Sequence, residues 1–159
     1  IFDACNDPRN LKRATDAAKK TGKHVQMAIS YATTPYHTKE VYADLAKSYA
    51  DFGADSICIK DMSGLLKPYE AYDLVKAIKK AVDLPVEIHS HATTGLSVAT
   101  LLKAAEAGAD VAIVDLNLEG AEKVAKEIAE ATGSKTIAIK CDVTNKENIG
   151  VTGVKLDQA

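Results

Sequence analysis

The segment GADSICIKDMSGLLKPYEAYDLVKAIK (53–79) holds the pattern that decides the fold. A glycine that ends the preceding helix is followed by an apolar strand, predicted over 55–61, and then by a helix predicted over 67–82, whose apolar residues recur every three to four positions. A strand that is almost continuously apolar is typical of a parallel sheet buried on both faces. The segment therefore predicts one strand–helix unit of an α/β protein.

The same unit recurs along the chain. Further strands are predicted at 1–4, 24–30, 85–90, 110–116 and 135–143, with a short one near the end, and further helices at 8–20, 37–51, 96–107 and 119–132. The fold class is therefore α/β with a parallel sheet of βα units, either a partial TIM barrel or a Rossmann-like three-layer sandwich. We expect a single domain over 1–159. A sequential sheet of six or seven strands has all its helices on one face, and its bare apolar face favours a homo-oligomer.

Two segments of the chain follow the same pattern. GADVAIVDL (108–116) repeats GADSICIKD (53–61): a glycine, a turn, apolar strand residues and a final acid. This similarity is weak evidence for duplication, because any two helix-to-strand joints can converge on it.

Composition and charge exclude several classes of protein. Lys and Arg number 20 against 22 Asp and Glu, so the net charge of −2 gives no reason to expect binding to nucleic acid or to an anionic membrane. No apolar run approaches the about 18 residues of a membrane span, and no signal-peptide pattern opens the chain. The three cysteines are odd in number and widely spaced, which favours reduced thiols in a cytoplasmic protein.

Ionisable side chains gather where the predicted strands end. Because the carboxyl ends of parallel strands share one edge, where ligands bind in barrels and open sheets, we expect one common edge. The residues predicted there are Tyr31, Lys60, Asp61, His89, His91, Asp115 and Asp142. His89 and His91, two apart on a strand, point to the same face, which leaves open a metal site or a purely structural pair.

Four stretches carry a resemblance to a known family. They are FDACNDPRNL (2–11), HVQMAISY (24–31), ADSICIKDMSGLLKPYEAYDLVKAIK (54–79) and LPVEIHSHATTGLS (84–97). Over about 1–110 the chain resembles the carboxyltransferase barrel of biotin-dependent enzymes such as oxaloacetate decarboxylase and pyruvate carboxylase. The resemblance implies that carbamylated Lys60, His89 and His91 join an aspartate in holding a divalent metal, zinc, cobalt or manganese, which polarises a keto-acid.

The sequence departs from that family's ligand set. The aspartate ligand belongs to a first barrel strand that has no counterpart among these residues, so three ligands remain at most. For Lys60, a charged lysine paired with Asp61 or Asp115 is favoured over a carbamate.

A second resemblance covers about 101–155, which looks like the front portion of a short-chain dehydrogenase. It implies that Asp115 binds the adenosine ribose and that Asp142 binds the adenine amino group. The glycine-rich phosphate loop is replaced by HATTGLS with the single Gly95, and the catalytic Tyr-x-x-x-Lys segment is absent. NAD binding is therefore not favoured.

The segment KAAEAGAD (103–110) suits both families. We therefore interpret the chain as a designed or recombinant chimera, carboxyltransferase-like over 1–107 and Rossmann-like over 108–159, and favour a non-catalytic scaffold with at most a residual metal site. The alternatives are a metal-dependent oxaloacetate decarboxylase or carboxyltransferase that uses Lys60 in catalysis and a keto-acid as substrate, and a weak NAD or adenosine-nucleotide binding module.

Overall fold

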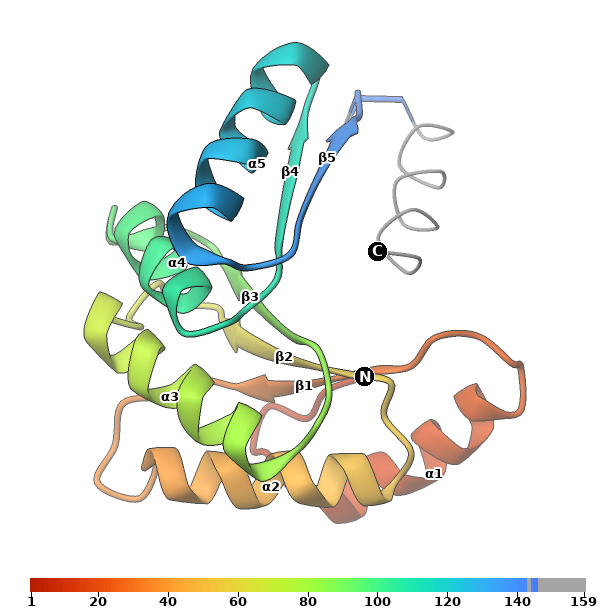
Figure 1. The fold of residues 1–159 in the computed structure, drawn as a ribbon. Helices are drawn as coiled ribbons and strands as arrows, with labels where there is room; N and C mark the ends of the chain where they lie inside the picture. Colours follow the sequence, from red (N-terminus) through yellow and green to blue (C-terminus); the bar gives the residue numbers. More distant parts are fainter. Residues whose placement is uncertain (143, 146–159) are drawn as a thin grey trace. The chain divides into compact units, whose positions relative to one another are not determined.

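The computed structural model describes residues 1–142, 144 and 145 (Figure 1). The chain divides into two compact units, Ile1–Ala109 and a second that begins at Asp110. That these units act as a single domain stays a prediction.

The first unit is a parallel α/β layer. Its strands are β1 (Gln26–Ser30), β2 (Ser56–Asp61) and β3 (Val86–Ser90), and its helices are α1 (Pro8–Lys19), α2 (Lys39–Asp51), α3 (Pro68–Ala81) and α4 (Ser97–Glu106). The strands pair in the order β1-β2-β3, all parallel. The predicted α/β class is confirmed.

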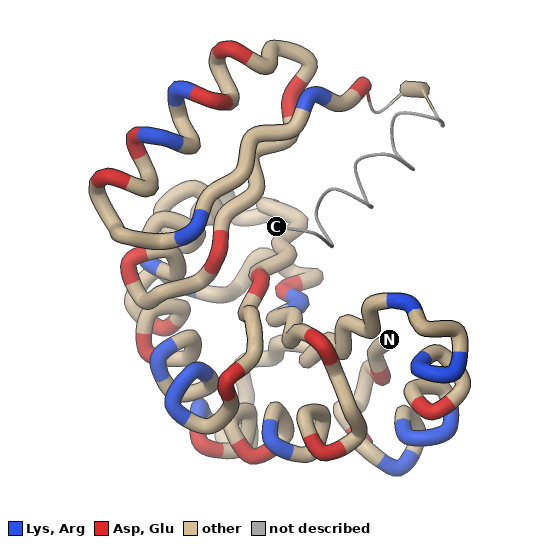
Figure 2. Tube along the Cα trace, turned by 45° about the vertical axis from the view of Figure 1, so that its right-hand side comes forward, with Lys and Arg blue, Asp and Glu red and all other residues tan. Residues whose placement is uncertain are grey.

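The second unit contains β4 (Val111–Asp115), α5 (Leu118–Thr132) and β5 (Thr136–Lys140), and its two strands are parallel. Figure 2 shows acidic and basic residues following one another along α5, where Lys123–Glu127 and Lys126–Glu130 form i,i+4 ion pairs. Gly133, with a φ of 72°, ends this helix in the left-handed conformation. None of the described helices is long and apolar enough to cross a membrane.

The prediction of one sheet of six or seven strands is wrong for the described residues, which form a three-stranded and a two-stranded sheet. Apolar runs locate strands but do not determine which strands pair. The predicted strand 1–4 shrinks to one bridge between Phe2 and Ala28, because the main chain turns directly afterwards, where the Asp3 carbonyl accepts the Asn6 N–H at 3.1 Å. The predicted last strand lies outside the described residues.

The core of the first unit lies between the sheet and its helices. The strand register aligns Met27, Ile57 and Val86 in one row and Ile29, Ile59 and Ile88 in the next. This face packs with buried residues of α2 and α3, which lie along the sheet in Figure 1. Each fully buried aliphatic side chain stabilises the fold by about 1.5–3 kcal/mol. The core therefore fixes the sheet that carries the site residues.

The opposite face of the sheet has a different chemistry. Because side chains alternate along a strand, the residues between the core positions point the other way. The register places Ser30, Lys60 and His89 in one row at the carboxyl edge. Two residues predicted as site components are thus neighbours on adjacent strands.

Candidate functional site

The two histidines lie side by side at the carboxyl end of β3. His89 is in the strand and His91 follows its last residue; their ring centroids are 5.1 Å apart with an interplanar angle of 65°. Two imidazoles that share one ion at about 2.1 Å per nitrogen have ring centroids about 5 Å apart. Both residues are exposed. The separation of the two rings and their exposure are therefore compatible with a common cation.

The local environment keeps His89 in the form that binds metals. Desolvation of the ring, then the Lys60 ammonium and His91, hold the pKa of His89 below its ordinary value of 6.5. Neutral imidazole is the ligand form of histidine. At neutral pH His89 is therefore predominantly a neutral donor.

Lys60 does not pair with Asp61, so that prediction is wrong. The two are consecutive on β2 and point to opposite faces of the sheet. The Asp61 carboxylate accepts the main-chain N–H groups of Leu65 at 2.9 Å and Leu66 at 3.0 Å. The Lys60 Nζ instead lies 5.2 Å from the centroid of the Phe2 ring, a cation–π contact. Asp115, the other predicted partner, belongs to the second unit.

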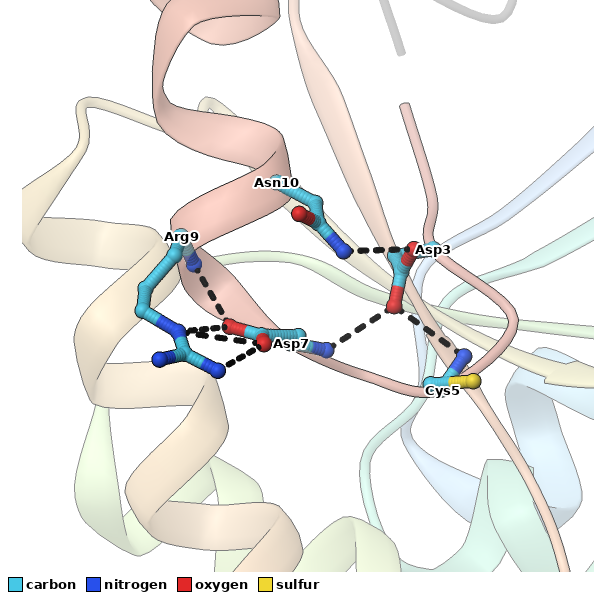
Figure 3. Close-up of polar contacts among 5 residues, drawn as sticks. All are labelled: Asp3, Cys5, Asp7, Arg9 and Asn10. Carbon is cyan, nitrogen blue, oxygen red and sulfur yellow. Dashed lines mark hydrogen bonds and ion pairs between the residues drawn. The ribbon is translucent and has the colours of Figure 1, made fainter.

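A polar turn holds the amino-terminal segment beside Lys60. Figure 3 shows the Asp3 carboxylate accepting hydrogen bonds from the main chain of Cys5 and Asp7 and from the Asn10 side chain. Asn6, with a φ of 56°, exchanges two hydrogen bonds of 2.8 Å with the main chain of Ser30. These contacts dock the segment that carries Phe2 onto β1.

Sequence analysis missed this turn as part of the site. The available signal was the cluster of Asp and Asn in FDACNDPRN (2–10), residue types that hydrogen-bond to nearby main chain in turns.

Tyr31 follows Ser30 on the chain and faces a separate cavity. That cavity has a volume of about 590 Å³, and its lining includes Tyr31, His37, Tyr42 and Glu70. The Tyr31 hydroxyl donates to Glu70 Oε2 at 3.1 Å, and burial, then the Glu70 carboxylate, raises the pKa of Tyr31. Tyr31 is therefore not part of the row that Lys60 and His89 form.

The free cysteines match the interpretation as reduced thiols. Cys58 and Cys141 are buried and Cys5 is exposed, each without a disulfide. Burial raises the pKa of the Cys58 thiol to about 11, so that it remains protonated at neutral pH.

Asp115 and Asp142 lie at the carboxyl end of the two-stranded sheet in the second unit. Asp115 Oδ1 accepts the Asn117 N–H at 2.8 Å, and Asn117 rather than Asp115 caps α5. Asp142 Oδ1 accepts the main-chain N–H of Thr144 at 2.9 Å and its hydroxyl at 2.7 Å. The predicted common edge is thus divided between two sheets. The adenosine-binding roles of these aspartates stay predictions.

Few side chains on the first sheet could bind a metal ion. Across residues 1–142, 144 and 145, no group of three or more His, Cys, Asp and Glu side chains is arranged to hold a metal. Two imidazoles with Lys60 in the neighbouring register position form an incomplete set, which fits a divalent cation if Lys60 becomes an oxygen donor.

A parallel α/β sheet with ionisable side chains at its carboxyl edge is common to barrel-type and open-sheet enzyme domains. The family model described as "HMGL-like" matches residues 6–144. The chain belongs to this family.

The relatives are named as carboxylases or carboxyltransferases. The pyruvate carboxylase B subunit of Methanocaldococcus jannaschii is 55% identical over 111 residues, which are 70% of this chain and 20% of that protein. The methylmalonyl-CoA carboxyltransferase 5S subunit of Propionibacterium freudenreichii is 47% identical over 135 residues, 82% of this chain and 27% of that protein. The chain thus spans about a fifth to a quarter of these relatives.

Solved structures of carboxyl transferase domains also match the chain. The carboxyl transferase domain of Rhizobium etli pyruvate carboxylase, with pyruvate, superimposes with a TM-score of 0.67 at 37% identity over 69% of this chain and 20% of that chain. A second structure of that domain covers 89% of this chain and 21% of that chain, with a TM-score of 0.67 at 30% identity.

The interpretation as a designed or recombinant chimeric scaffold is wrong. The family match runs through the supposed junction at 103–110 without a break, and the 5S-subunit match covers 82% of the chain. The dehydrogenase resemblance has no support from these matches. The error has a physical cause: a helix that ends in Ala-Gly-Ala-Asp before an apolar strand is a joint that both folds use.

Proposed function

We propose that this chain is the part of a biotin-dependent carboxyltransferase in which Lys60, His89 and His91 hold a divalent cation that binds a 2-oxo acid. The observation that carries the proposal is the row of Lys60 and His89 on adjacent strands with His91 packed against His89. The names of the relatives, which include pyruvate carboxylase and 2-oxoglutarate carboxylase, support the substrate class.

Each residue has a distinct role in this proposal. His89 and His91 donate neutral ring nitrogens. The Lys60 amine, once deprotonated, adds to CO₂ with loss of a proton, and the resulting carbamate supplies an anionic oxygen. A bound divalent cation polarises a carbonyl oxygen and stabilises the negative charge that develops there.

The chain supplies an incomplete ligand set, so the proposal includes further protein. The matched relatives are named as parts of larger enzymes: a B subunit, a 5S subunit and a large subunit. These names support a chain that works within an oligomeric carboxylase, with its remaining ligand from outside these residues. A cytoplasmic location stays a proposal from the sequence alone.

Equilibrium dialysis against Mn²⁺, Co²⁺ and Zn²⁺, with and without bicarbonate, tests the proposal. We expect about one ion per wild-type chain, tighter binding with bicarbonate, and no binding by the double variant His89→Ala, His91→Ala. The matched control is His37→Ala, whose ring contacts Thr34 and Tyr42 away from the row. Equal metal content in the wild type and the double variant overturns the proposal.

A second test concerns Lys60 and the reaction. The bicarbonate effect is expected to disappear in Lys60→Arg, because an arginine side chain forms no carbamate in this way. Pyruvate release from oxaloacetate above the rate of the free metal supports the decarboxylase form of the activity, and a rate that the double variant shares contradicts it.

A further inference from the structure

We infer that the turns after β2 and β3 form one clasp, residues 61–66 with 91–95, in which Asp61, Gly64 and Thr94 are positioning residues for His91. This inference rests on the proposed function, because His91 matters chemically as a metal ligand. None of the three side chains is offered as a ligand. They act by fixing the main chain that carries the second imidazole.

Asp61 shapes the first turn and ties it to the second. Its side chain is 1% exposed, and both carboxylate oxygens accept main-chain N–H groups of the first turn. Its carbonyl oxygen accepts the His91 N–H at 3.3 Å. A single residue thus organises one turn and contacts the main chain of the ligand residue in the other.

Gly64 and Thr94 join the two turns at their tips. The Thr94 hydroxyl donates to the Gly64 carbonyl oxygen. Gly64 has a φ of +67°, and a Cβ there would lie 2.9 Å from the Thr93 nitrogen and 3.2 Å from the Thr94 nitrogen. Only glycine permits both this backbone conformation and this close approach.

The backbone directly after His91 is strained. Ala92 has a φ of 58°, a left-handed conformation that costs a residue with a Cβ about 1–2 kcal/mol. Such a conformation persists only where the surroundings impose it. The Ala92 N–H donates to Ser90 Oγ at 3.2 Å, and the Ala92 carbonyl oxygen accepts the Gly95 N–H at 3.0 Å. The clasp therefore holds the chain in the turn that places His91 against His89.

The clasp is anchored to the helix that follows it. The Thr100 hydroxyl, in α4, donates to the Leu66 carbonyl oxygen at 2.8 Å, and Thr100 is buried. The first turn is thus fixed at both ends, by β2 through Asp61 and by α4 through Thr100, and it provides a rigid support for the second.

The main test is Thr94→Val, which keeps the side-chain shape and removes the hydroxyl. The matched control is Thr93→Val, because the neighbouring Thr93 hydroxyl makes no hydrogen bond within the part of the chain that the structure describes. We expect about tenfold weaker Co²⁺ binding for Thr94→Val, the lower end of the range for direct partners of metal ligands, because Thr94 acts on His91 only through the main chain. Thr93→Val is expected to bind like the wild type, and Thr94→Ser to restore the affinity.

Two further readouts separate positioning from folding. In the metal-free protein, the nuclear Overhauser contact between the rings of His89 and His91 is expected to weaken in Thr94→Val and to remain in Thr93→Val. Ala92→Gly relieves the backbone strain, so its thermal midpoint is expected to rise while Co²⁺ binding and the ring contact weaken. If the clasp only stabilised the fold, the substitution would change the thermal midpoint and the Co²⁺ affinity in the same direction.

The outcomes distinguish this inference from the proposed function. Absence of metal binding by the wild type overturns the proposed function, while the ring contact in the metal-free protein still tests the clasp. Wild-type ring contact in both Thr94→Val and Ala92→Gly overturns the clasp, whatever the metal does.

Discussion

Strands β2 and β4 come from segments of the same pattern, GADSICIKD (53–61) and GADVAIVDL (108–116), but they lie in different surroundings. Five of the six residues of β2 are buried, whereas no residue of β4 is. The strand β2 has β1 on one side and β3 on the other, whereas β4 pairs only with β5 among the described strands. The difference in burial therefore comes from the surroundings of each strand and not from the local pattern.

The acids that end the two strands differ in the same way. Asp61 is buried and its carboxylate accepts two main-chain N–H groups, whereas Asp115 is exposed and accepts one. The same residue in the same pattern thus shapes a turn next to the candidate site in the first unit, and in the second accepts a single hydrogen bond in the turn that precedes α5.

The largest expected difference between β2 and β4 is in the stability lost when an isoleucine of the strand is shortened. Ile59→Ala is expected to lower the free energy of unfolding by about 4 kcal/mol, because it leaves a cavity at a fully buried position between Ile29 and Ile88. Ile113→Ala, at a partly exposed position of β4, is expected to cost about 1–2 kcal/mol. Urea unfolding followed by circular dichroism measures both, and equal losses would contradict the difference in burial.

The next largest difference in stability is expected for the acids that end β2 and β4. Asp61→Ala is expected to destabilise by about 3 kcal/mol, since the buried N–H of Leu66 and the part-buried N–H of Leu65 both lose their acceptor. For Asp115→Ala we expect less than about 1 kcal/mol, because water replaces the lost acceptor at an exposed position. Thermal unfolding compares the two variants, and a loss as small for Asp61→Ala as for Asp115→Ala would show that the turn does not depend on the carboxylate.

The smallest effect is electrostatic and depends on pH. Asp55 in the first unit accepts hydrogen bonds from Lys19 Nζ at 2.7 Å and from the Val25 N–H at 2.8 Å, and the Lys19 ammonium in particular holds the pKa of Asp55 below 3.8. A lowered pKa contributes stability above the unfolded value, and this contribution disappears as the pH falls through the folded pKa.

We therefore expect Asp55→Asn to be less stable than the wild type by about 0.5–1 kcal/mol at pH 7, with the difference shrinking as the pH falls below about 3.8. Glu127→Gln is the control in the second unit, since its 4.0 Å pair with Lys123 is exposed and contributes little. Unfolding at a series of pH values measures both, and a pH-independent loss in Asp55→Asn would refute the electrostatic account.

Much of the fold was predictable because it follows local rules. Apolar runs and 3.6-residue periodicity located all five described strands and all five described helices. The pairing of the strands was not predictable. The runs at 110–116 and 135–143 are as apolar as 55–61, and no local feature of the sequence indicates that β4 belongs to a separate sheet. The strand at 1–4 failed because Asp3 and Asn6 favour a turn.

Part of the site was predictable because it also follows from local sequence. The His-x-His spacing at the end of a strand places both rings on one face, which the structure has. The partner of Lys60 was not predictable, because Phe2 lies 58 positions away in the sequence and reaches Lys60 only through the docked amino-terminal turn. The chimera interpretation failed because a common helix-to-strand joint was taken as a junction between families.

X-ray absorption at the metal edge of the Co²⁺-loaded chain counts the imidazole ligands at the ion and so tests the proposed metal site without relying on activity. We expect two imidazoles per ion in the wild type, and none in the double variant His89→Ala, His91→Ala. A wild-type spectrum with only oxygen donors would contradict the proposal that the adjacent histidines at the end of β3 hold a metal.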